Sequence, residues 1–238
     1  MSDADASDNG ERDVGASNND ANDNGASDND ASDSGSQEIA GLRDEVARRL
    51  VHASGAAVPL AWLLGAPWWL VQAFMVFAAL VAAVLEAVRL FVGLEWVVYD
   101  KLTREYEQDN PAGYALYMWS VAAVVLVFGF EPRIAVVAML ALSLGDPVSG
   151  LLASGELRTV KRPRVLGAMF LVTLAVAWPF LPLSAAVLAA VGATIADGVK
   201  PQFRGIVVDD NLSIPIVVAA AGWVGVRYLP EVVGPLAS

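Results

Sequence analysis

Seven apolar segments are the feature that most restricts what this chain can fold into. They lie at residues 52–66, 68–90, 115–130, 133–153, 165–182, 184–199 and 212–229. A transmembrane helix needs about 20 residues. The first, third and sixth segments are shorter, so we expect some of them to be tilted or extended by flanking residues. With 56% hydrophobic residues, the chain is too apolar for an ordinary soluble domain. The sequence predicts an all-α, polytopic integral membrane protein with about seven transmembrane helices.

The first 38 residues form a separate segment of different composition. They consist almost wholly of Asp, Asn, Ser, Gly and Ala, and they carry eleven acidic side chains against one basic side chain, Arg12. Most of the net charge of −11 therefore belongs to this tail. Such a composition cannot bury enough apolar surface to offset the entropy of ordering. We expect residues 1–38 to be a disordered acidic tail and residues 39–238 to be a membrane-embedded domain.

The basic residues of the predicted loops indicate the orientation. If the N-terminus is cytoplasmic, only Arg133 and Arg227 lie on the outer side. Twelve others lie on the cytoplasmic side: Arg43, Arg48, Arg49, Arg89, Lys101, Arg104, Arg158, Lys161, Arg162, Arg164, Lys200 and Arg204. This bias agrees with the positive-inside rule. It predicts a multi-pass protein of the cell membrane whose chemistry takes place at the cytoplasmic face.

Asp146 is a carboxylate inside the fourth apolar segment. An ionisable side chain at membrane depth costs about 2.5 to 3.5 kcal/mol on insertion scales unless it faces protein, water or an ion. Gly145 and Pro147 flank it, and both disfavour a continuous helix. We therefore expect a helix break at this point and a polar pocket around Asp146. Its role is either that of a metal or substrate ligand or that of a cap on a kinked helix.

The residue inventory limits the possible metal chemistry. The chain has no cysteine and a single histidine, His52, which we expect in a structural role at the inner interface. A metal would therefore be held by oxygen ligands, which favours Mg²⁺. The basic loop from Arg158 to Arg164, followed by Gly167, could hold phosphate oxygens. Positive-inside topology alone also explains that loop.

Two further acidic groups lie near predicted inner helix ends. Asp197 and Lys200 are three residues apart, so they form either an ion pair on one helix face or part of a catalytic site. Asp209-Asp210-Asn211 precedes Pro215, which predicts a helix that starts between Asn211 and Ile214. Capping explains Asn211 and one of the two carboxylates. Glu86 and Arg89 are also three apart, and we expect them to pair near the inner end of the second span.

Three motifs resemble those of the dolichol kinase and phytol kinase family of polyprenol kinases, which is related in pattern to the phosphatidate cytidylyltransferases. The matching pieces are Arg48-Arg49-Leu50-Val51-His52, Leu144-Gly145-Asp146-Pro147-Val148-Ser149-Gly150 and Asp210-Asn211-Leu212-Ser213-Ile214-Pro215-Ile216. The last is close to the family's D-N-L-T-I-P and is the most specific. The resemblance covers roughly residues 45–229. The acidic tail lies outside it and looks like a haloarchaeal addition.

The resemblance implies an integral membrane enzyme that phosphorylates an isoprenoid alcohol with CTP and a divalent metal such as Mg²⁺. It implies that Asp146 binds metal or nucleotide, that Asp210 and Asn211 belong to the same site, and that Asp197 matches an acidic position of the family. We expect Asp146 and Asp210 to hold the metal and Asp197 to orient or deprotonate the lipid hydroxyl. We expect five residues to bind the triphosphate, four of them because of their positive charge. They are Lys161, Arg162, Arg164 and Lys200, together with Gly167.

Alternative functions remain open at this point. The family commonly carries K-S-x-E-G between the two later motifs, and this sequence has Lys161-Arg162-Pro163-Arg164-Val165-Leu166-Gly167 instead. A cytidylyltransferase that makes a CDP-activated lipid would share CTP, the metal and the topology. A transporter with a broken helix at Asp146 and a non-catalytic membrane scaffold are alternatives from other classes. No nucleic-acid partner is expected. The sequence contains no P-loop, no GxGxxG after a predicted strand and no GxSxG, which are motifs of soluble enzymes.

Overall fold

The computed structural model describes residue 46 and residues 49–92, 111–153, 161–199, 202–203 and 206–230. All of them belong to one compact unit, Asp44–Ser238. The predicted disordered tail at residues 1–38 and the predicted phosphate ligand Lys200 lie outside the described residues.

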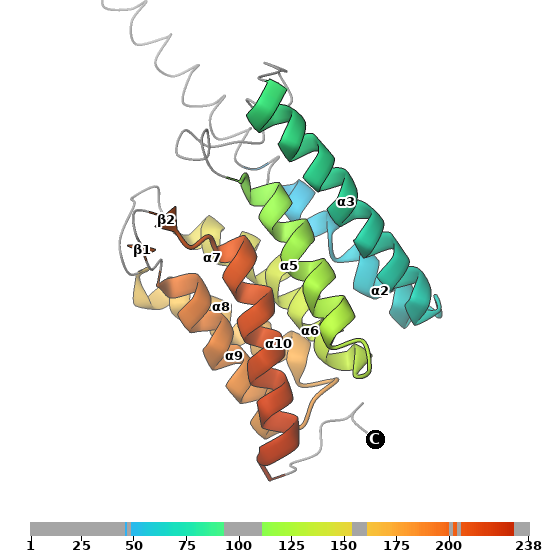
Figure 1. Cartoon of the computed structure of the whole chain (residues 1–238). Coiled ribbons are helices and arrows are strands. Elements are labelled where there is room, and N and C mark those ends of the chain that lie inside the picture. Colours follow the sequence, from blue (N-terminus) through green and yellow to red (C-terminus); the bar gives the residue numbers. More distant parts are fainter. Residues whose placement is uncertain are drawn as a thin grey trace, which may run out of the picture. The chain divides into compact units, whose positions relative to one another are not determined.

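The described chain is almost entirely helical (Figure 1). A short helical stretch at residues 49–54 precedes the labelled elements. The helices are α2 Ala57–Leu63, α3 Trp68–Val92, α5 Gly113–Val127, α6 Pro132–Leu140, the π-helical segment η2 Ala141–Gly145, α7 Asp146–Leu152, α8 Pro163–Ala177, α9 Leu183–Gly198 and α10 Asp210–Tyr228. The described residues also include an antiparallel pair of two-residue strands, β1 Gln202–Phe203 and β2 Ile206–Val207.

The predicted apolar segments correspond closely to these helices. Six of the seven coincide within a few residues with one helical run, and the first is divided by a turn at Gly55 and Ala56. Three runs are long and apolar enough to cross a membrane: Trp68–Phe91, Pro132–Leu152 and Asp210–Tyr228. Helices α5, α8 and α9 are apolar but shorter. The structure is thus that of a helical protein with several segments suited to a membrane.

Helix α6 and segment η2 form the centre of the packing. Every residue from Ile134 to Leu142 is buried, so this run is surrounded on all sides. Helix α10 packs against α9, α5 and α6, while α3 packs against α5 and α8 packs against α9 and α7. The contact between α9 and α10 is very close, because a Cβ at Gly225 would collide with Ala185. Small residues permit such an approach between apolar helices.

A tight turn joins α2 to α3. Gly65 has a φ of +104°, a left-handed conformation that glycine adopts without steric cost. The amide of Ala66 donates to the carbonyl of Ala61 at 2.9 Å, and the amide of Gly65 donates to Trp62 at 3.0 Å. These bonds satisfy the last carbonyls of α2 in the manner of a Schellman ending. Helices α2 and α3 are thereby held side by side as a hairpin.

Glu86 connects α3 to the beginning of α5. Its carboxylate pairs with the Arg89 guanidinium, accepts a hydrogen bond from the Ala112 amide at 3.0 Å and accepts another from the Tyr114 hydroxyl at 2.6 Å. Glu86 is only 2% exposed. The predicted pairing of Glu86 with Arg89 is confirmed, and the same carboxylate also fixes the first turn of α5.

Replacing Glu86 by glutamine is expected to destabilise the protein. The amide carries no charge for Arg89, and removing one partner of a buried pair costs about 3 kcal/mol or more. The measurement is the midpoint of thermal unfolding in a defined detergent. Glu131→Gln is the matched control, because Glu131 is exposed and exposed substitutions usually change stability by about 0.5 kcal/mol or less. Equal midpoints for the two variants would contradict the proposed connecting role of Glu86.

Candidate functional site

Asp146 begins α7, directly after the π-helical segment η2. The expected break at Gly145 and Pro147 is wrong, because the helical run continues from Pro132 to Leu152. Pro147 has no amide hydrogen for the carbonyl four residues earlier, which disfavours regular α-helical bonding here. The chain widens into a π-turn instead, a feature that occurs frequently at functional sites. The expected polar pocket around Asp146 is present, since Asp146 lines a cavity.

Three carboxylates from three helices meet at this point. Asp146 of α7, Asp197 of α9 and Asp210 of α10 each offer an oxygen, and these oxygens lie within 4.8 Å of one another. Asp197 is fully buried, Asp210 is 5% exposed and Asp146 is partly exposed. These are the three acidic residues that the sequence analysis singled out as catalytic. We call them the carboxylate trio.

Lys161 supplies the compensating charge for the buried part of the trio. Its Nζ lies 2.6 Å from Asp197 Oδ1 and 3.9 Å from Asp210 Oδ2. The other oxygen of Asp197 accepts a hydrogen bond from the Ser149 hydroxyl at 2.6 Å. Lys161 Nζ also donates to Ser149 Oγ at 3.3 Å. Asp197 therefore pairs with Lys161, and it is not among the residues that line the cavity. The ion pair with Lys200 that the sequence left open lies outside the described residues.

The beginning of α10 separates the roles of two adjacent aspartates. Asp209 is the residue before the helix, and its carboxylate accepts hydrogen bonds from the Asn211 amide at 2.9 Å and from Asn211 Nδ2 at 2.8 Å. Asp209 is therefore the residue that caps α10. Asp210, in the first turn of the helix, is not needed as the cap and contributes its carboxylate to the trio. The helix begins at Asp210, one residue before the predicted range, because Asp209 is the cap.

Pro215 lies inside α10 and affects the same turn. We expected proline only in the first helical turn, but here it is five residues beyond the first helical residue, Asp210. Proline has no amide hydrogen to donate to the Asn211 carbonyl. The Ser120 hydroxyl of α5 donates to that carbonyl at 2.7 Å instead. This bond joins α5 to α10 directly beside the trio.

Asn211 leaves one polar atom available to a ligand. Its Oδ1 is buried and has no hydrogen-bond partner among the described residues, whereas its amide nitrogen is used by Asp209. Asn211 lines the cavity together with Asp210 and Asp146. Carboxylate and amide oxygens are the donors that Mg²⁺ and Ca²⁺ prefer. The donor set around the trio therefore fits a hard divalent cation.

Two residues of the helical stretch 49–54 complete the polar end of the cavity. Arg49 Nη1 donates to the Pro147 carbonyl at 3.2 Å, and Gly150 leaves room for the guanidinium, with which a Cβ would collide. His52 Nε2 lies 3.8 Å from Asp146 Oδ2. The His52 ring contacts Tyr117 edge to face at a centroid distance of 4.8 Å. The one histidine is thus part of the site, whereas we expected it to be structural at the interface.

Three residues of the site, Arg49, Ser149 and Tyr117, have no individual role predicted from the sequence. Ser149 follows Asp146 by three residues, and residues at this spacing share a helix face. The same spacing relates Arg49 to His52. Those two signals were available in the sequence. Nothing in the sequence indicated Tyr117, whose hydroxyl shares a 2.8 Å hydrogen bond with Ser143 of η2.

The predicted phosphate ligands are only partly brought to the site. Lys161 lines the cavity, but Arg162, Arg164 and Gly167 are not among the residues that line it. Arg162 is the residue before α8, and Arg164 and Gly167 lie in its first turns. Arg164 is exposed, and open space surrounds the position that a Cβ would take at Gly167.

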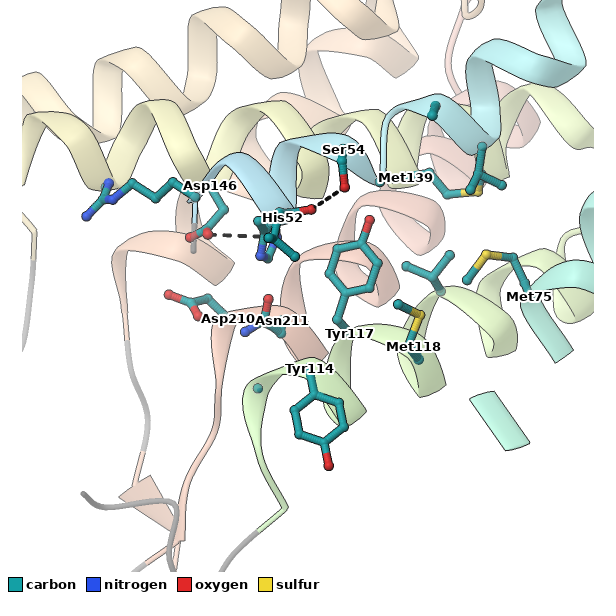
Figure 2. A pocket seen from close by; sticks show the side chains of 18 of the residues that line it. His52, Ser54, Met75, Tyr114, Tyr117, Met118, Met139, Asp146, Asp210 and Asn211 are labelled. Carbon is teal, nitrogen blue, oxygen red and sulfur yellow. Dashed lines mark hydrogen bonds and ion pairs between the residues drawn. The ribbon is translucent and has the colours of Figure 1, made fainter. Parts of the chain in front are cut away.

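The cavity next to the trio has a volume of about 460 Å³ and two unlike ends. Figure 2 shows Asp146, Asp210 and Asn211 at one end and Met75, Met118 and Met139 at the other, with His52 and Tyr117 between them. Sites of this size, mostly apolar with a few convergent polar groups, are typical of small-molecule binding. The shape suits a ligand with a polar head and an apolar tail.

No protein-family model, curated protein or solved structure matches the chain. The function must therefore be argued from the chemistry of the site. Three clustered carboxylates, two cationic side chains and an apolar extension of the same cavity are the features that any function has to use.

Proposed function

We propose that the chain is a membrane lipid kinase that transfers a phosphoryl group from CTP, or another nucleoside triphosphate, to the hydroxyl of an isoprenoid alcohol. The observation that supports this most directly is that one cavity is lined at one end by Asp146 and Asp210 of the carboxylate trio and at the other by Met75, Met118 and Met139 (Figure 2). We call this second end the apolar arm. A metal-bound triphosphate fits the first, and a lipid tail fits the second. The kinase has seven membrane spans and a cytoplasmic N-terminus, so the site faces the cytoplasmic supply of nucleotide.

In this proposal Asp146 and Asp210 hold Mg²⁺, and the buried Asn211 Oδ1 is a further oxygen that could act as a ligand. When bound, the metal neutralises charge on the triphosphate, which is the main requirement of phosphoryl transfer. Lys161 and Arg49 line the cavity and contribute positive charge to the phosphate oxygens. Lysine acts as a point charge, whereas the planar arginine can bind two oxygens at once.

Asp197 has a positioning role in this proposal. It is fully buried, bonded to Lys161 and Ser149, and absent from the cavity wall. It therefore holds Lys161 Nζ between two carboxylates and does not contact the lipid hydroxyl. The hydroxyl oxygen forms a bond to the γ-phosphorus, the bond from that phosphorus to CDP breaks, and the hydroxyl proton is released. The products are a lipid monophosphate and CDP.

Purified protein incubated with Mg²⁺, γ-labelled CTP and isoprenoid alcohols is expected to place the label in the lipid fraction and to release CDP in equal amount. The assay is repeated with ATP and at high salt, with EDTA as the metal-free control. Label released as pyrophosphate together with a CDP-lipid would contradict the kinase and support the cytidylyltransferase. No turnover with any nucleotide would favour a transporter or a scaffold.

A further inference from the structure

We propose that the isoprenoid alcohol reaches the site sideways, through an opening between α2 and α3 beside Phe74. The proposal deepens the proposed function and rests on it, because it names the path and the binding surface of the lipid acceptor. The hydroxyl end lies at the carboxylate trio, the first isoprene units lie in the apolar arm of the cavity, and the remaining tail leaves past Phe74.

The walls of the apolar arm show where it is closed and where it is open. Met75 and Met139 are 2% and 1% exposed, so the arm is sealed on their side. Phe74 is the neighbour of Met75 on α3, lines the same cavity, and is 52% exposed. Ala57, which lines the cavity from the first turn of α2, is exposed as well. Ala57 of α2 and Phe74 of α3 are therefore exposed residues of the cavity wall, and the proposed opening lies between them.

Phe74 also belongs to the outward face of α3. Large exposed apolar side chains follow one another on this helix at spacings of three and four, which places them on one face. They are Leu70, Phe74, Phe77, Val81 and Val84. Helix α3 is one of the runs that are long and apolar enough to span a membrane. Across a bilayer, this face contacts hydrocarbon, so a lipid can pass from the membrane to the cavity without crossing water.

The size of the cavity requires such an opening. About 460 Å³ corresponds to a site for a drug-sized ligand, which is much less than the volume of a long polyprenol. Helix α2 is seven residues long, and its residues that line the cavity are Ala57 and Val58. Most of a long tail must therefore remain in the membrane while the hydroxyl reaches the trio.

The absence of cysteine from the chain gives a direct test. Phe74→Cys and Phe77→Cys are prepared in lipid nanodiscs and labelled with N-phenylmaleimide, with and without a C20 isoprenoid alcohol and without nucleotide. At a concentration of ten times its Kd, the alcohol should slow labelling at position 74 about tenfold. Labelling at position 77, one turn along the same exposed face, should not change. Equal protection at both positions, or none at position 74, would overturn the proposal.

A second variant keeps the test independent of how well the cysteine variant folds. Phe74→Trp should lower kcat/KM for a C55 alcohol about tenfold by narrowing the opening, with Phe77→Trp as the control. The KM for CTP should stay unchanged, and the loss with a C10 alcohol should be clearly smaller, because a shorter tail leaves less of its length in the opening. An equal loss with both alcohols would overturn the proposal.

The two proposals can be told apart. If position 74 is protected but no alcohol is phosphorylated, the proposed lipid path is supported and the proposed kinase activity is contradicted. If the wild-type protein phosphorylates the alcohol and position 74 is not protected, the proposed lipid path is contradicted and the proposed kinase activity is supported.

Discussion

Asp210→Asn is expected to lower the rate of lipid phosphorylation about a thousandfold and to weaken the apparent affinity for Mg²⁺. Asp210 contributes one of the three carboxylates whose oxygens lie within 4.8 Å of one another. A bound metal supplies several kcal/mol of charge stabilisation to phosphoryl transfer, and each 1.36 kcal/mol corresponds to about a tenfold change in rate. An asparagine at this position keeps the shape but provides no negative charge for the cation. Initial rates across a Mg²⁺ titration measure both effects.

Asp209→Asn is the matched control, because it removes the same charge one residue earlier. Asp209 caps α10 through hydrogen bonds to the Asn211 amide and side chain. Asparagine caps helices about as well as aspartate, so the activity of this variant should stay within about threefold of wild type. If the two variants lose activity equally, the chain needs the overall acidity of this turn and Asp210 has no specific part in binding metal.

The helices could be predicted from the sequence because each apolar segment has to satisfy its own backbone hydrogen bonds in an apolar environment. Local chemistry set some details that the apolar pattern alone could not show. The first helical residue of α10 depends on which aspartate is the cap, and its interior Pro215 depends on a hydroxyl from α5. The widening at η2 likewise replaced an expected break. The cap and the widening depend on neighbouring residues, Asp209 and Pro147, whereas the bond to the Asn211 carbonyl comes from another helix.

The carboxylates of the site could be predicted for a similar reason. Acidic residues within or beside apolar segments stand out because their burial is costly unless they are used. The cationic partners could not be assigned in this way, since basic residues occur near several helix ends. Lys161 was one of several basic residues in its loop, and only the folded structure, in which α8 packs against α9, shows that Lys161 pairs with Asp197. Arg49 and His52 are far from the trio in sequence and meet it only in the folded chain.

Lys161 has two roles in this arrangement, and they can be separated experimentally. Its Nζ neutralises Asp197, which is fully buried, and it also lines the cavity near Asp210. Lys161→Met is therefore expected to reduce both stability and activity. Removing one partner of a buried ion pair costs about 3 to 5 kcal/mol, which for a chain of this size lowers the unfolding midpoint by about 10 °C.

The double variant Lys161→Met with Asp197→Asn should recover most of that stability. Asparagine is neutral, so no uncompensated charge is buried, and its side-chain oxygen can still accept the hydrogen bond from Ser149. Activity should stay low, about a hundredfold below wild type, because the phosphate oxygens still lack the lysine charge. Thermal unfolding and initial rates measured on the same samples separate the two effects. If activity returns together with stability, Lys161 is only a structural partner of Asp197, and the positive charge that the transferred phosphoryl group requires must come from another residue.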